Sequence, residues 1–140
     1  MIKNIIFDLD GTLVDSIPDI NASVNKTLEH IKFPSLDIEH TKKYVGNGAR
    51  ILINKVLNHF SNEYDKKYLE SIENDVYSFY IDYYSKHCTD YTKLYDNVLE
   101  TLQNFYKLNI NMFIISNKPN EMTITTTKKL NIYNYFKSII

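Results

Sequence analysis

The sequence predicts an α/β fold, in which a Rossmann-like parallel sheet is interrupted by an inserted α-helical cap domain. Short apolar runs that end in turn residues occur near the start of the chain and again in its last third, as is typical of strands. Helical periodicity fills the long stretch between them. Strands that alternate with helices are typical of a parallel sheet, and the first helical stretch is too long for a simple crossover.

Three strands are expected from these apolar runs. The first lies at Ile2–Phe7, where β-branched and apolar residues precede Asp8, and its composition predicts a buried strand. The second and third are expected at Asn111–Ile115 and Phe136–Ile140. Together with the helices between them, they predict an incomplete parallel sheet.

Helices are expected wherever apolar residues recur at three- and four-residue steps. Ser16 and Asp19 are candidate caps at the start of the first helix, and Pro18 is tolerated in its first turn. The expected helices are Ser16–Ile31, Thr41–Tyr44, Ala49–Phe60, Tyr64–Lys86, Val98–Tyr106 and Asn120–Leu130.

Two domains follow from this order of elements. The α/β core is expected to comprise residues 1–15 and 87–140, and the helical cap residues 16–86. Hinges are expected near Val14–Ser16 and Lys86–Leu94. A helical block inserted after the first strand of a sheet is the reason for separating the cap from the core.

Composition excludes several functional classes. The chain has 140 residues, 44% hydrophobic and 24% charged, with a formal net charge of −1. No strong field favours nucleic acid or an anionic membrane as a partner. The apolar start is too short for a signal peptide, and no apolar stretch approaches the ~20 residues of a membrane helix. A single cysteine, Cys88, cannot form an internal disulfide, so we expect a cytoplasmic protein.

Polar segments follow the first two strands, at the sheet edge where parallel sheets bind ligands. Asp8 and Asp10 are two residues apart and share one side of an extended backbone. Close carboxylates repel unless a cation or a proton separates them. Because Mg²⁺ is commonly held by one or two carboxylates plus substrate phosphate, the pair predicts a site for Mg²⁺ and a phosphate ester, although an isolated Asp-x-Asp is often only a turn or a cap.

Each polar residue has a candidate role. Asp8 can attack phosphorus and form an aspartyl-phosphate, while Asp10 can protonate the leaving oxygen and later activate water. The Ser116 hydroxyl and the Asn117 amide can donate to phosphate oxygens, and Lys118 can add a positive charge.

Two residues of the turn complete the candidate phosphate site. Gly11 lets the backbone turn and approach a ligand closely, and Thr12 follows it. Taken alone, the Ser-Asn-Lys-Pro segment after the second strand is typical of a plain loop.

Three segments of the sequence resemble motifs of one family. Phe7–Ser16 (FDLDGTLVDS) resembles the first motif of the haloacid dehalogenase-like hydrolases. Ile114–Pro119 (IISNKP) and Tyr44–Ala49 (YVGNGA) resemble the second motif and the cap loop of the phosphoglycolate phosphatase branch. Leu94–Val98 reads LYDNV where that branch usually has Tyr-Pro-Gly-Val. The resemblance covers essentially the whole chain.

The resemblance implies a role for each matched residue. Asp8 would be the nucleophile and a Mg²⁺ ligand, and Asp10 the acid–base, with its backbone carbonyl on the metal. Ser116 and Asn117 would hold the transferring phosphoryl group. The cap loop would close over the substrate through Gly46, Asn47, Gly48 and Arg50. Taken alone, the Gly-Asn-Gly segment is typical of a turn, and Arg50 of a solvated helix residue.

The sequence also departs from the family pattern. The family has a lysine before a fourth strand and a Gly-Asp-x-x-x-Asp segment after it; neither occurs here, and Lys128 and Lys129 lie too early. In the family the fourth strand pairs with the first, so the edge of Ile2–Phe7 is expected to be open. We therefore expect a fragment of a protein of roughly 210 residues, sized from the missing βαβαβ portion. Such a fragment would have little turnover of its own.

Three functions are compatible with these features. The leading hypothesis is a Mg²⁺-dependent phosphatase that hydrolyses a small phosphomonoester, with 2-phosphoglycolate as the favoured substrate. A phosphosugar mutase or another phosphatase of the same superfamily is the enzymatic alternative. A non-catalytic interaction module, which associates through the open sheet edge, is the alternative of another class.

Overall fold

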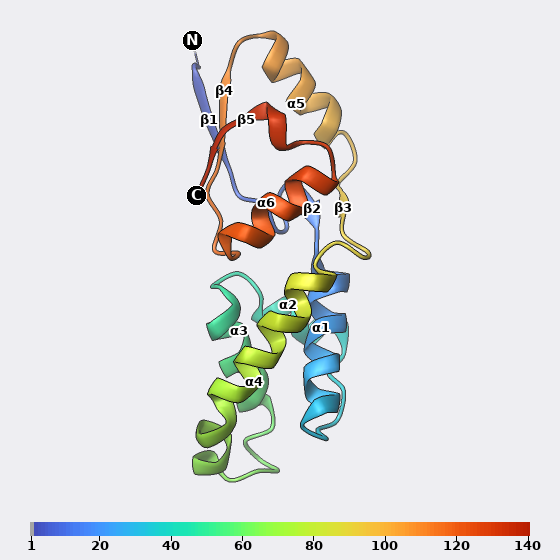
Figure 1. Cartoon of the computed structure of the whole chain (residues 1–140), viewed down its shortest axis with the longest axis vertical. Coiled ribbons are helices and arrows are strands. Elements are labelled where there is room, and N and C mark those ends of the chain that lie inside the picture. Colours follow the sequence, from blue (N-terminus) through green and yellow to red (C-terminus); the bar gives the residue numbers. More distant parts are fainter. Residues whose placement is uncertain (1) are drawn as a thin grey trace. The chain divides into compact units, whose positions relative to one another are not determined.

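The computed structural model describes residues 2–140 and contains two compact units. One unit comprises Met1–Ser16 and Thr89–Ile140, and the other comprises Ile17–Cys88. The first is an α/β unit with a parallel sheet, and the second is entirely helical (Figure 1). The predicted fold class is therefore confirmed.

The α/β unit is built on three parallel strands in the order β1-β4-β5. They are β1 (Asn4–Phe7), β4 (Asn111–Ile114) and β5 (Phe136–Ile139). Phe7 lies opposite Ile114 in the register of β1 and β4. Because the strands are parallel, the segments that follow them leave the sheet at one edge, where parallel sheets bind ligands.

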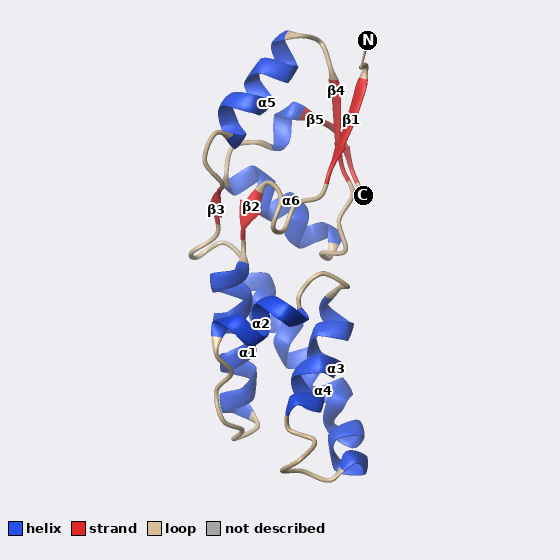
Figure 2. Ribbon diagram, turned by 180° about the vertical axis from the view of Figure 1, so that it is seen from behind, coloured by secondary structure: helices blue, strands red, loops and turns tan. Residues whose placement is uncertain are grey.

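Two helices cover one side of this sheet (Figure 2). They are α5 (Val98–Lys107) and α6 (Asn120–Lys129), and a short 3₁₀ helix, η1 (Tyr133–Tyr135), precedes β5. Leu102 of α5 and Met112 of β4 are buried in one apolar cluster between helix and sheet. This packing holds the central strand, and so the loop that follows it, in place.

The first strand is not buried, and the prediction that it would be is wrong. Each residue of β1 is exposed or half-buried, and Ile6 is 61% exposed. Within residues 2–140, β1 pairs only with β4 and is therefore an edge strand. Alternate side chains of a strand point to opposite faces, so Phe7 packs against the core while its neighbour Ile6 does not.

A second, two-stranded sheet was not predicted. It joins β2 (Val14–Asp15) to β3 (Lys93–Leu94) in antiparallel register. Just beyond it, the Tyr95 N–H donates to the Leu13 carbonyl over 3.1 Å. Strands of two residues are too short to show alternation, which is why the sequence pattern missed them.

The helical unit contains four helices with an apolar interior. Its helices are α1 (Ile17–His30), α2 (Ile38–Tyr44), α3 (Ala49–His59) and α4 (Lys66–His87). Asp37 caps α2, because its carboxylate accepts from the His40 N–H over 2.9 Å, and this hydrogen bond holds the pKa of Asp37 below its ordinary value. None of the helices described in residues 2–140 is long and apolar enough to span a membrane.

The expected cap at Ser16 is wrong. The Ser16 hydroxyl is buried and has no hydrogen-bond partner among residues 2–140. Residues on a loop before a helix cap it only when their side chains turn back to the first N–H groups, and that of Ser16 does not.

Asparagine takes over a backbone role that glycine often fills. Asn97, just before α5, has φ 65°, and Asn109 and Asn131, which follow α5 and α6, have φ 55° and 58°. Asparagine is among the few residues that enter this left-handed region readily. The phosphoglycolate phosphatase branch has glycine at the position of Asn97. Because asparagine also adopts a positive φ, the chain keeps the same backbone turn although the motif differs.

We expect Asn97→Ala to lower the free energy of unfolding by about 1 kcal/mol, because alanine disfavours a positive φ, whereas Asn97→Gly should leave it unchanged or raise it. The Asn97 side chain makes no capping hydrogen bond, so the pair of variants isolates the backbone effect. Urea unfolding measures both. Equal losses in the two variants would contradict a conformational cause.

Candidate active site

The segment after β1 forms a tight turn that presents two carboxylates. The Leu9 side chain is fully buried in a cluster with Leu13 and Val14. The side chains on either side of it therefore point elsewhere: that of Asp8 is exposed and that of Asp10 is half-buried. The Leu9 N–H donates to Asp8 Oδ1 over 2.7 Å. The buried leucine thus anchors both aspartates at the end of the strand.

Gly11 makes the turn possible. Its φ is 78°, a conformation that side chains rarely adopt, although a Cβ at this position would meet no atom within 4 Å. The Gly11 N–H donates to the Val14 carbonyl (2.9 Å) and the Thr12 N–H to the Leu9 carbonyl (3.2 Å). Both backbone donors are therefore occupied inside the turn, and the side chain of Thr12 remains exposed.

The loop after β4 leaves the same edge of the sheet. Backbone hydrogen bonds extend the pairing past the strand end, from the Ile115 N–H to the Phe7 carbonyl (2.9 Å) and from the Ser116 N–H to the Ile140 carbonyl (3.0 Å). The Lys118 N–H then donates to Ser116 Oγ over 3.2 Å and tightens the loop. The Asn117 side chain is exposed.

An ion pair joins the two loops. Lys118 Nζ lies 3.2 Å from Oδ1 and 3.5 Å from Oδ2 of Asp10. The Lys118 side chain is 1% exposed and that of Asp10 17%. Buried charges are stable only when paired, so this contact fixes both side chains. The contact therefore joins Asp10, in the turn after β1, to Lys118, in the loop that follows β4 and contains Ser116.

Tyr95 belongs to the same neighbourhood and was missed by the sequence analysis. Burial raises the pKa of the Tyr95 hydroxyl, and the carboxylates of Asp15 and Asp10 raise it further. The sequence signal that could have pointed to Tyr95 was its position in Leu94–Val98, the segment that departs from the family motif.

The remaining candidates, Gly46, Asn47, Gly48 and Arg50, lie in the helical unit. Gly46 and Gly48 have φ of 129° and 89°, so the segment is a turn before α3. The Arg50 guanidinium lies over the Tyr77 ring at 3.8 Å, and its Nη1 donates to Asn74 Oδ1 over 2.7 Å. Side chains of α4 therefore hold Arg50. Closure of the turn at residues 46–48 over a substrate stays a prediction.

The donor set at the end of β1 fits Mg²⁺ better than a transition metal. In the described residues, 2–140, no three His, Cys, Asp or Glu side chains are grouped to hold a metal ion. Mg²⁺ needs fewer protein ligands, since one or two carboxylates suffice beside water and substrate phosphate. The Asp10 carboxylate is paired with the Lys118 ammonium, whereas the Asp8 side chain is exposed and open to a metal. Metal binding by Asp10 stays a prediction.

Comparison with known proteins agrees with this geometry. A family model described as haloacid dehalogenase-like hydrolase matches residues 5–140. A phosphoglycolate phosphatase of Chromobacterium violaceum is 32% identical over 142 residues, which cover 99% of this chain and 61% of that protein. Phosphoglycolate phosphatase 1 of Pseudomonas aeruginosa is 35% identical over 136 residues, covering 97% and 49%. The chain thus spans about half to three fifths of the length of these relatives.

A solved structure shares the arrangement of the elements. The crystal structure of a predicted phosphoglycolate phosphatase from Haemophilus somnus 129pt superposes with a TM-score of 0.93 at 27% identity. The match covers 99% of this chain and 62% of the other. The architecture around the two loops is therefore that of the same fold.

We expect Asp15→Asn to lower the pKa of Tyr95 toward the ordinary value of a phenol, because one of the two carboxylates that raise it is lost. The contribution of burial should remain. Carbon-13 NMR titration of the tyrosine Cζ resonance, assigned with Tyr95→Phe, measures the change. A pKa that stays constant or rises would contradict the placement of Tyr95 beside these carboxylates.

Proposed function

The chain belongs to the haloacid dehalogenase-like hydrolases, and on that premise we propose that it supplies the nucleophile and the phosphate-binding loop of a Mg²⁺-dependent phosphatase. The proposed substrate class is a small phosphomonoester. We favour 2-phosphoglycolate within this class, because relatives named phosphoglycolate phosphatase match nearly the whole chain. The proposal concerns the protein that carries this chain, since the relatives are longer. We place its activity in the cytoplasm, the compartment that fits a sequence with a single cysteine and therefore no internal disulfide.

One observation carries the proposal: the two loops meet. The register that sets Phe7 opposite Ile114 delivers both loops to the same edge, and the 3.2 Å contact of Lys118 with Asp10 joins them. A nucleophile and the groups that bind the phosphoryl oxygens must all lie within reach of the same phosphoryl group to act together. This arrangement supports that geometry.

The reaction proceeds in two displacements. A carboxylate oxygen of Asp8, which is exposed, forms a bond to phosphorus while the ester P–O bond breaks and Asp10 gives a proton to the leaving oxygen. Asp10 then takes a proton from water as the water oxygen bonds to phosphorus. The bond between phosphorus and Asp8 breaks, which releases inorganic phosphate and restores the carboxylate.

The other residues hold the phosphoryl group. The Ser116 hydroxyl, the Asn117 amide and the Lys118 ammonium would donate to its oxygens. Because the backbone N–H groups of Gly11 and Thr12 are engaged in the turn, Thr12 would contribute its exposed hydroxyl. Mg²⁺ held by Asp8 and Asp10 would offset the negative charges of nucleophile and phosphate.

The helical unit, residues 17–88, is proposed to be the cap of this site. Its glycine-containing turn at 46–48 precedes α3 and is the segment that would close over the non-phosphate end of the substrate. Closure of this kind excludes water from the reacting groups.

We expect the protein that carries this chain to release phosphate from 2-phosphoglycolate only with Mg²⁺, and Asp8→Asn to reduce the rate on the order of 10⁶-fold, as for the loss of a serine nucleophile in a hydrolase. Asp75→Asn, an exposed carboxylate of α4, is the matched control and should keep the rate. Colorimetric phosphate assay measures both. Undiminished hydrolysis by Asp8→Asn would refute the role of Asp8 as the nucleophile. A preference for phosphosugars in a panel of phosphate esters would favour the phosphosugar mutase or phosphatase alternative.

A second candidate function is association through the β1 edge, favoured by the exposure of Ile6 and by the unpaired side of the strand in the described residues. We expect Ile6→Lys to abolish any concentration-dependent dimer of the 140-residue chain, because an edge charge blocks strand pairing. Leu108→Lys, at a site 69% exposed, is the control and should not change it. Sedimentation velocity decides; a monomer at all concentrations would eliminate this candidate.

A further inference from the structure

Two histidines of the helical unit, which the candidate active site does not use, lie side by side on neighbouring helices. His40 belongs to α2, and His59 is the last residue of α3. Their ring centres are 4.8 Å apart, and the ring planes are inclined at 73°. The side chain of His40 is 40% exposed, and His59 is also exposed. Solvent and dissolved ions can therefore reach both rings.

Each ring has one nitrogen that is already engaged. Nδ1 of His40 lies 2.8 Å from Oδ1 of Asp37. A carboxylate only accepts hydrogen bonds, so the neutral His40 ring carries its proton on Nδ1 and keeps a lone pair on Nε2. Nδ1 of His59 lies 3.0 Å from the Tyr44 hydroxyl oxygen. When that oxygen accepts from Nδ1, His59 has its lone pair on Nε2 as well.

This arrangement is typical of histidines that bind a metal ion. Such histidines usually donate their second ring N–H to a carboxylate or another oxygen, which fixes the orientation of the ring. Because Zn–N bonds are about 2.0–2.1 Å long and the ligands are tetrahedral, two imidazoles on one Zn²⁺ ion have ring centres about 5 Å apart. The separation of 4.8 Å between His40 and His59 matches this spacing.

We propose that His40 and His59 form a binding site for a divalent transition cation such as Zn²⁺, with Nε2 of each ring as a ligand. Asp37 and Tyr44 orient the rings and are not ligands themselves. Among residues 2–140, no third His, Cys, Asp or Glu side chain is placed to complete the set, so water would fill the remaining positions.

The chemistry of the donors separates this site from the one proposed for Mg²⁺. Imidazole nitrogen suits Zn²⁺, Cu²⁺ and Ni²⁺, whereas Mg²⁺ prefers oxygen ligands. The two histidines belong to the helical unit, and the aspartates after β1 belong to the α/β unit. The inference therefore does not depend on the proposed function.

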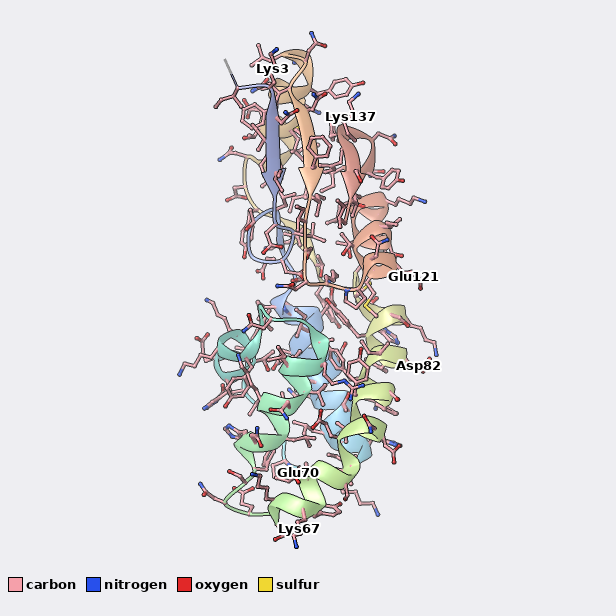
Figure 3. The ribbon with its side chains drawn as sticks, turned by 90° about the vertical axis from the view of Figure 1, so that its left-hand side faces the viewer. Lys3, Lys67, Glu70, Asp82, Glu121 and Lys137 are labelled. Atoms are coloured by element: carbon pink, nitrogen blue, oxygen red, sulfur yellow. The ribbon has the colours of Figure 1, made fainter. Side chains whose placement is uncertain are left out.

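Calorimetric titration of Zn²⁺ into the full 140-residue chain, with Mg²⁺ in excess to occupy carboxylate sites, tests the proposal. His40→Ala and His59→Ala each remove one ligand, and Asp37→Asn removes the carboxylate that orients His40. His30→Ala is the control for the histidine variants, because the His30 ring stacks on a phenyl ring at 4.1 Å. Asp82→Asn is the control for Asp37→Asn, because Asp82 is a similarly exposed carboxylate, on α4 (Figure 3).

We expect one Zn²⁺ ion to bind per unaltered chain. Asp37→Asn should weaken this binding about tenfold, as is usual for the loss of an outer-shell partner. Each of His40→Ala and His59→Ala should weaken it by more than about 100-fold, because a ligand is lost and not only an orienting group. Both controls should match the unaltered chain. Long-range ¹H–¹⁵N NMR spectra should show Zn²⁺ on Nε2 of both rings.

Unchanged binding in either His40→Ala or His59→Ala would overturn the site, because the ion would then not need both rings. Absence of Zn²⁺ binding in the unaltered chain would overturn it too. Circular dichroism verifies that each variant is folded. Where an alanine variant does not fold, His40→Gln or His59→Gln replaces it, since glutamine is polar but has no imidazole. None of these results bears on hydrolysis, which the phosphate assay tests separately.

Discussion

The parallel pairing of β1 with β4 is the constraint on which the remaining structure of the α/β unit depends. These strands are separated by about a hundred residues of chain, yet their register sets Phe7 opposite Ile114. Within the α/β unit, every polar group assigned to the site follows one of these two strands or contacts a residue that does. A slip of one residue would turn Leu9 out of the core and direct the aspartates to the other face.

Charge pairing and apolar packing act together at this edge. Leu9 is buried, and the turn that follows is closed by hydrogen bonds to its carbonyl, so the positions of Asp8 and Asp10 rest on an apolar anchor. The ion pair of Asp10 with Lys118 then ties the turn to the loop after β4. A buried pair of this kind adds little net stability, because the cost of desolvating both charges offsets their attraction. The ion pair thus fixes the position of the two loops relative to each other.

The sequence correctly predicted the helices and the central strand, but it did not predict the exposure of the first strand. The helix from Ala49 and the strand from Asn111 begin where the sequence predicted them. Their apolar residues follow a local pattern that indicates the type of element without knowledge of its neighbours. The first strand was expected to be buried from its composition, but burial depends on neighbouring strands and helices, and β1 lies at an edge. The short pairing of β2 with β3 is likewise a product of contact between distant segments.

The amino-acid sequence by itself determined the fold class, the two polar loops and the pair of aspartates, because these depend on local spacing and on the chemistry of carboxylates at strand ends. Only the tertiary structure decided that Lys118 pairs with Asp10, that Tyr95 stands near the same carboxylates, and that Arg50 is held by α4. The physical reason is that a long side chain can reach several partners, and the choice among them is made by burial and by charges contributed from remote parts of the chain.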